Sequence, residues 1–74
     1  MSYKVSIVIE KDEHGCYAYC PDLEGCQTQG RSVEEAIDNI KEAIEPYLET
    51  MPEDEIRSAL SQEILTTTLE VRVA

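Results

Sequence analysis

Three cysteines and one histidine are among the residues of this 74-residue chain that could bind a metal or act as nucleophile and base. Cys16, Cys20 and Cys26 would form a zinc site with His14 as the fourth ligand. The spacing disfavours such a site, because the sulfurs of Cys16 and Cys20 would lie roughly 13 Å apart on an extended strand. No recognisable nucleophile accompanies His14. Free thiols in a reducing cytoplasm, and a solvated His14 in a turn, are the preferred interpretation.

Residues 25–32 differ at one position from the phosphate-binding P-loop pattern, in which two glycines precede a Lys and a Ser or Thr. Arg31 stands where the pattern has Lys, and Arg does not freely replace that compact charge. The residues between Gly25 and Gly30 also have the composition of a strand rather than of a loop around phosphate. We therefore interpret Gly30 as the end of a strand and Ser32 as a helix cap.

Acidic side chains form the clearest pattern in the sequence. On a helix that begins after Ser32, six of them span roughly 100° of the helical wheel, opposite an apolar stripe. Like charges at i,i+4 cost about 0.2–0.5 kcal/mol per pair, so helix stability alone does not explain them. Two interpretations stay open, a docking face for a basic protein and a solubilising surface. The candidate binding residues are Glu34, Glu35, Asp38, Glu42, Glu45 and Glu49.

One further carboxylate, Asp22, follows Pro21 where a strand should end, and it is the best candidate ligand for a divalent metal. Magnesium takes one or two carboxylates, usually together with a substrate phosphate, and nothing in the sequence fixes a second ligand near Asp22. We expect Asp22 instead to form a turn by bonding the backbone two residues on. The sequence thus predicts no catalytic residue, metal or cofactor, and a metal-dependent hydrolase is the less favoured alternative.

The overall charge restricts the class of partner. Sixteen acidic residues against six Lys and Arg give a formal charge of −10, which should repel nucleic acids and anionic membranes and attract basic proteins. No apolar run approaches the roughly 20 residues of a membrane span, and no apolar leader opens the chain. We expect residues 1–74 to form one cytoplasmic domain. Because so small a domain buries only about 60% of its unfolded surface, we also expect a homodimer or higher homo-oligomer.

Hydrophobic periodicity of two predicts strands, and Gly and Pro mark their ends. The strands should form an antiparallel sheet, so the fold class is α+β with one long helix on one face. The last strand should return either beside the first strand or to a second subunit. The predicted strands are residues 3–10, 16–20, 26–29 and 69–73.

The long helix should begin with a capping box, in which Ser32 caps the amide of Glu35 and Glu35 reaches back to the amide of Ser32. Its apolar stripe continues at helical spacing to Leu48. Pro46 lies inside this pattern and should kink or end the helix nearby. A weak second helix is predicted at residues 53–60, which gives the order β-β-β-α-(α)-β.

The run YAYCPDLEGCQTQG at residues 17–30, followed by the helical segments EEA, NIKEAI and YL, resembles the HicB-like antitoxin family. The resemblance covers about residues 3–48. Glu24 departs from the usual Pro, and Arg31 with Ser32 departs from the usual acidic residue and Thr, although Ser32 can still act as a cap. The motif positions that match or preserve the family pattern are Pro21, Asp22, Leu23, Gly25, Gly30 and Ser32.

The resemblance implies a partial ribonuclease-H-like fold of order β-β-β-α-β. It also implies an antitoxin that covers a small basic HicA-type toxin and blocks its access to the mRNA that the toxin cleaves. Many family members carry a C-terminal DNA-binding domain, whereas residues 51–74 have no basic face for reading DNA, so we expect no repressor activity. An orphan dimeric adaptor without a toxin is the other alternative.

Overall fold

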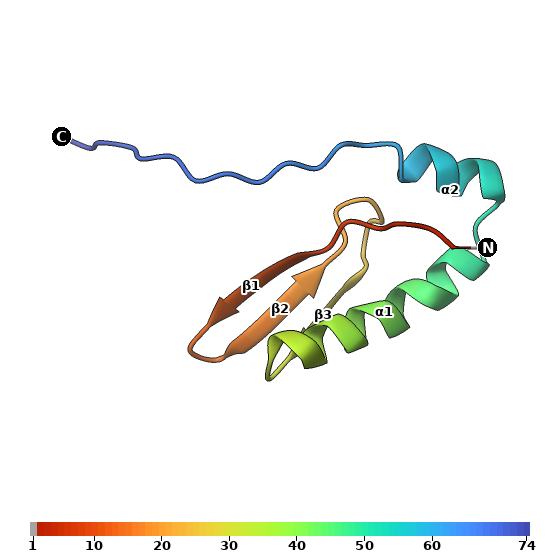
Figure 1. Ribbon diagram of the computed structural model, residues 1–74, viewed down its shortest axis with the longest axis horizontal. Coiled ribbons are helices and arrows are strands. Elements are labelled where there is room, and N and C mark those ends of the chain that lie inside the picture. Colours follow the sequence, from red (N-terminus) through yellow and green to blue (C-terminus); the bar gives the residue numbers. More distant parts are fainter. Residues whose placement is uncertain (1) are drawn as a thin grey trace.

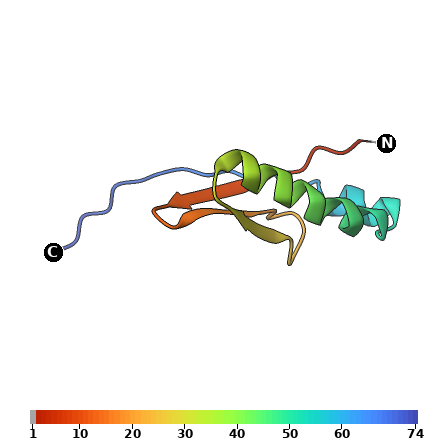
Figure 2. The same ribbon diagram turned by 90° about the horizontal axis from the view of Figure 1, so that it is seen from below.

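The computed structural model describes residues 2–74, which form an antiparallel three-stranded sheet and two helices. The strands follow one another in the order β1-β2-β3, and the longer helix, α1, packs on one face of the sheet (Figures 1 and 2). The predicted α+β class, with three strands before a long helix, is therefore confirmed. The elements are β1 (Val8–Asp12), β2 (Gly15–Tyr19), β3 (Gln27–Gly30), α1 (Val33–Glu49) and α2 (Glu53–Ala59).

The register of the sheet separates a buried face from an open face. On β2, Cys16 and Ala18 are buried towards α1, whereas Tyr17 is exposed on the opposite side. A tight turn joins β1 to β2, and in it the amide of His14 donates to Asp12 Oδ1 at 2.8 Å. Because side chains alternate along a strand, this register fixes which half of each strand enters the core.

The core lies between β2, the loop that follows it, and α1. It contains neither Phe nor Trp, so aliphatic side chains and thiols fill the space. α1 packs mainly on β3, less on β2 and least on β1. The residues of this core cluster are Cys16, Ala18, Cys20, Leu23, Cys26, Ala36, Ile40 and Ile44.

The start of α1 confirms the predicted cap and corrects one of its bonds. Ser32 Oγ accepts a hydrogen bond from the amide of Glu35 at 3.1 Å, as expected for an N-cap. Glu35 Oε1 accepts from the amide of Arg31 at 3.3 Å, one residue before the Ser32 amide that the capping box would use. The carboxylate therefore secures the incoming chain rather than the cap residue.

Pro46 lies inside α1, which ends within one turn of it, at Glu49, in agreement with the predicted helix end nearby. Pro46 removes one donor, so the carbonyl of Glu42 loses its usual helical partner. Glu42 and Pro46 are both exposed, so water can bond that carbonyl. Ile44 and Leu48 pack on the core on either side of Pro46 and hold the last turns in place.

The two ends of the chain differ from the prediction. Residues 3–7 were expected in the first strand, but the strand begins at Val8, and Val5 and Ile7 pack against the core without pairing. The last predicted strand, 69–73, is also wrong for the single chain. Residues 63–74 form neither helix nor strand, and no edge of the sheet pairs with them. The predicted ribonuclease-H-like order, which needs that strand, stays a prediction.

Candidate functional site: the acidic face of the long helix

The six acidic residues predicted as a binding face are all exposed on α1. Ala36, Ile40 and Ile44 are buried against the sheet from the other side of the helix, so the carboxylates point to solvent. Across the described part of the chain, residues 2–74, none of the six makes an ion pair with Lys, Arg or His. We call Glu34, Glu35, Asp38, Glu42, Glu45 and Glu49 the acidic face.

The acidic side chains of α1 interact favourably with the helix dipole at the N-terminal end of the helix and unfavourably at the C-terminal end. Glu34 and Glu35 lie in the first turn, where the positive end of the dipole favours carboxylates. Glu45 and Glu49 lie near the negative end, and the last turn holds no basic residue. The second half of the acidic face is therefore electrostatically unfavourable within this chain, and a cationic partner would relieve it.

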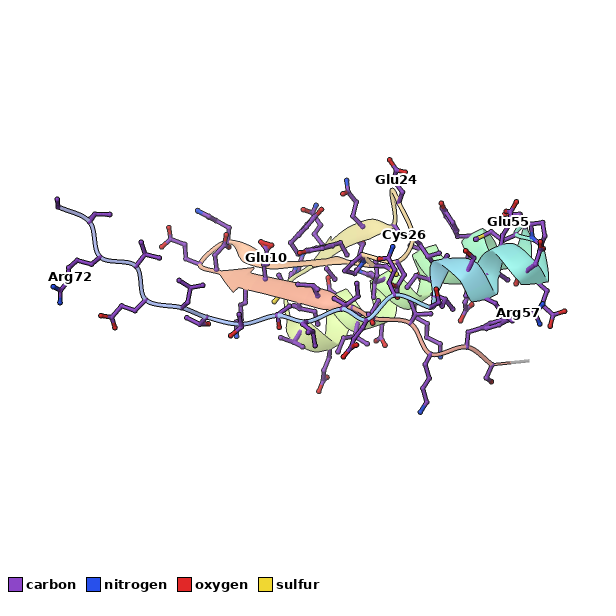
Figure 3. The ribbon with its side chains drawn as sticks, turned by 90° about the horizontal axis from the view of Figure 1, so that it is seen from above. Glu10, Glu24, Cys26, Glu55, Arg57 and Arg72 are labelled. Atoms are coloured by element: carbon purple, nitrogen blue, oxygen red, sulfur yellow. The ribbon has the colours of Figure 1, made fainter. Side chains whose placement is uncertain are left out.

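The acidic surface extends into α2, which the sequence interpretation missed. Glu53, Asp54 and Glu55 are exposed in its first turn, and Glu53 pairs with Arg57 at 3.4 Å. Figure 3 shows Glu55 and Arg57 at the end of the molecule formed by α2. The consecutive acids at 53–55 were a visible signal, but the proximity of α2 to the end of α1 depends on the turn at residues 50–52.

The loop between β2 and β3 contains the family motif and is closed by its own backbone. The amide of Cys20 donates to the Cys26 carbonyl at 3.0 Å, and within the loop the amide of Leu23 donates to Cys20 and that of Cys26 to Leu23, both at 3.2 Å. Leu23 is buried, and Gly25 turns the chain with a φ of +85°, which favours glycine. Pro21 is half-buried at the start of this loop. The motif therefore forms a structured loop that contributes Leu23 to the core.

Asp22 does not bond the backbone two residues on, so that prediction is wrong. Its Oδ2 accepts a hydrogen bond from the amide of Ser6 at 3.3 Å and so holds the segment before β1 against the loop. Its Oδ1 is buried without a hydrogen-bond partner among residues 2–74. Within that range no group of three His, Cys, Asp or Glu is placed to hold a metal ion.

The P-loop-like segment forms a strand and a helix cap, as interpreted from the sequence. Gly30 is the last residue of β3, and a Cβ atom at this position would lie 2.6 Å from the backbone nitrogen of Ala36. Only glycine lets β3 and α1 approach so closely. Gly30 and Ser32 together set the position of α1 on the sheet.

The three cysteines are free thiols inside the core. Burial raises the pKa of the Cys20 thiol, although the backbone amides of Asp22 and Leu23 oppose that rise, and burial also raises the pKa of Cys26. A raised pKa keeps a thiol protonated and unreactive. His14 is exposed in the β1–β2 turn, where its Nε2 lies 3.4 Å from Glu13 Oε1. It is therefore separated from the three cysteines, which are buried in the core.

These features describe a small acidic α+β protein with one uncompensated charged helix face. A family model described as the HicB-like antitoxin of bacterial toxin–antitoxin systems matches residues 5–71, and the chain belongs to this family. The match extends well past residue 48, where the resemblance found in the sequence ends. Neither helix of residues 2–74 has the length and apolar character needed to cross a membrane.

Curated relatives of the chain are named UPF0150 proteins. The protein from Helicobacter pylori is 44% identical over 70 residues, which cover 95% of this chain and 97% of the relative. One from Synechocystis is 36% identical over 70 residues, covering 93% and 96%. One from Archaeoglobus fulgidus is 55% identical over 47 residues, covering 62% and 68%. No solved structure matches the chain significantly.

Proposed function

We propose that this chain is the antitoxin of a toxin–antitoxin pair and that it masks a small basic HicA-type toxin that cleaves mRNA. Membership of the HicB-like antitoxin family supports the antitoxin role. The observation that carries the choice of surface is the acidic face, where six exposed carboxylates have no cationic partner within residues 2–74.

The mechanism is competition for the cationic surface of the toxin. A protein that binds mRNA presents Lys and Arg to phosphates, and carboxylates can take the same donors, with Arg in two-pronged geometry. The negative potential of the acidic face would also speed encounter with a positively charged toxin. The bound domain then blocks the path of the RNA, so no chemical step by the antitoxin is needed.

The domain and its location follow from the same proposal. The elements from β1 to α1 share one core, and we propose that residues 1–74 act as a single domain around it. The toxin acts on mRNA, so the pair would meet in the cytoplasm. We keep the hydrolase as the less favoured alternative, because Asp22 accepts a hydrogen bond from the Ser6 amide and belongs to no group of three possible metal ligands in the described residues.

The test uses a HicA-type toxin encoded in the same genome and co-expressed with the full chain. We expect a stable complex whose association rate falls as salt is raised, because salt screens exposed charges over about 8–10 Å. The double variant Glu42→Lys/Glu45→Lys should lower that rate about tenfold. The matched control Glu24→Lys/Glu63→Lys makes the same change in net charge at exposed positions off α1 and should have a smaller effect.

Equal rates for the two double variants would remove the acidic face from the mechanism. Failure of the toxin to bind, together with unrelieved growth arrest on co-expression, would favour the orphan adaptor. A magnesium-dependent nuclease activity of the purified chain that is lost in Asp22→Asn would overturn the binding proposal altogether.

A further inference from the structure

An apolar groove lies between the segment before β1, α1 and α2. Its volume is about 730 Å³, and Lys41, Glu45 and Glu49 are among the charged residues beside it. It exists because α1 lies over β3 and β2 and hardly covers β1, which leaves Ile37 of α1 exposed. The apolar side chains that line it include Ile7, Ile37, Met51 and Ile56.

The groove leads into the free edge of the sheet. Ile7 lines the groove, and the next residue, Val8, begins β1. In the sheet of the described chain, β1 pairs only with β2, so the backbone groups on its outer side are open to another strand. A strand added there would direct alternate side chains towards α1 and the groove.

Residues 64–74, which we call the tail, have the pattern of such a strand. Leu69, Val71 and Val73 alternate with Glu70 and Arg72, and Leu65 lies in the same odd register. Thr67 interrupts that register, and Ile64 and Ala74 occupy even positions. The tail runs away from α2 as an extended segment along the β1 side of the sheet (Figure 1). The four apolar side chains in the odd register are Leu65, Leu69, Val71 and Val73, with 82, 72, 71 and 85% of their surfaces exposed.

The apolar end of the tail lies far from the groove of its own chain. Figure 3 shows Arg72 at one end of the molecule and Glu55 and Arg57, on α2, at the other, and the longest extent of the chain is 49 Å. Met51 and Ile56 place the groove at the α2 end. A second copy in the opposite orientation brings each tail to the groove of the other.

We propose that two copies of this chain form a symmetric dimer in which each tail docks along β1 and into the apolar groove of the other copy. A two-fold interface needs the same two surfaces on both partners, and one chain supplies both. Backbone pairing at the β1 edge supplies affinity, and alternate side chains in the groove supply specificity. The family match reaches residue 71, so it includes residues 64–71 of the tail.

The distribution of charge is consistent with a second copy of the chain as the molecule that occupies the groove. Two chains of charge −10 repel each other most strongly through their acidic faces. The tail carries only the charges of Glu70 and Arg72, which cancel. Residues 2–12, to the end of β1, carry Lys4 and Lys11 against Glu10 and Asp12, which also cancel. The tail and the β1 edge are therefore the surfaces through which two such acidic chains can meet. Glu45 and Glu49 border the groove, so a docked tail would lie beside them, whereas Glu34, Glu35, Asp38 and Glu42 are not among its lining residues. The proposal does not depend on any toxin.

The first experiment asks which chain a tail touches. Leu69 is replaced by the photoreactive residue p-benzoyl-phenylalanine in the full chain. Copies labelled with ¹⁴N and with ¹⁵N are mixed, irradiated and digested. We expect cross-links from the tail to residues 3–12 or to α2 that join a light peptide to a heavy one. Cross-links confined to peptides of the same isotope would place the tail on its own chain and overturn the proposal.

The second experiment measures the dimer by sedimentation of the chain alone. Leu69→Lys places a charge on the apolar side of the tail and should raise the dimer dissociation constant by about tenfold or more. The control Thr68→Lys adds the same charge on the other side and should change it far less. A monomer at all concentrations, or a dimer that Leu69→Lys leaves intact, would overturn the proposal. Neither result bears on toxin binding.

Discussion

Residues 8–49 and residues 50–74 differ in where their apolar side chains find partners. In the first region the sheet and α1 bury each other, and the core cluster lies wholly within that span. In the second region Ile56 is buried on α2, whereas the apolar side chains of the tail are exposed. The comparison shows that an apolar pattern predicts structure in a single chain only where the same chain supplies the surface to be covered.

The largest effect should come from removing a core side chain of the first region. Ile40→Ala deletes a buried side chain at the contact of α1 with the sheet and should lower the free energy of unfolding by about 2–5 kcal/mol. Leu65→Ala in the tail is the matched control and should change it by less than about 0.5 kcal/mol in the monomer. Urea unfolding at low chain concentration measures both. Equal losses would make the tail part of the monomer's cooperative unit.

A smaller loss is expected from Gly30→Ala. The added Cβ would lie 2.6 Å from a backbone atom of α1, so the strand and helix must separate, at a cost of about 1–3 kcal/mol. Gly25→Ala has no atom within 4 Å of the new Cβ and should lose only about 1 kcal/mol through its positive φ. Thermal unfolding separates the two. A neutral Gly30→Ala would show that α1 sits further from β3.

The N-caps of the two helices should contribute differently to stability, because only α1 has a side-chain hydrogen bond at its cap. Ser32→Ala removes the bond to the Glu35 amide and should cost about 1 kcal/mol. Pro52 stands at the cap of α2 without any side-chain hydrogen bond, so Pro52→Ala should change stability by less than about 0.5 kcal/mol. The same urea measurement applies. A larger loss at Pro52 would make α2 the better anchored helix.

The smallest effect is a pH dependence confined to the first region. Burial raises the pKa of Cys20 and Cys26 in the folded chain, so their contribution to stability is complete below the ordinary thiol pKa of 9.0 and is lost as pH rises past it. The free energy of unfolding should therefore fall more steeply above that pH in the wild-type chain than in Cys20→Ala/Cys26→Ala. Parallel curves would contradict a buried thiol contribution.

Local signals predicted most of the first region. The alternation on β2, the cap at Ser32 and the stripe of α1 depend on neighbours a few residues away, so the sequence contains them in readable form. The Asp22–Ser6 bond joins residues 16 apart and has no local signal. Pro46 indicated the end of the helix to within one turn, and packing of Leu48 on the core accounts for the last residues beyond it. The predicted strand at residues 69–73 does not form in the single chain, because a strand needs a partner edge and no strand of the sheet pairs with these residues.

In the candidate site, too, the features set by local periodicity were predicted and those set by a turn were not. Helical spacing placed the six carboxylates on one exposed face, because the buried stripe leaves only the opposite side to them. The acids of α2 were missed, because their position beside α1 depends on a turn rather than on periodicity. Which cation meets these carboxylates is a property of another molecule, so their binding role stays a prediction.

The close approach at Gly30 has a consequence for recognition. A helix seated directly on the strand before it, with no flexible linker between them, has little freedom to swing. Its carboxylates are therefore presented as a preorganised array, and an incoming molecule would lose little conformational entropy in ordering that surface. A rigid charged rod of this kind favours partners whose cations already match its spacing.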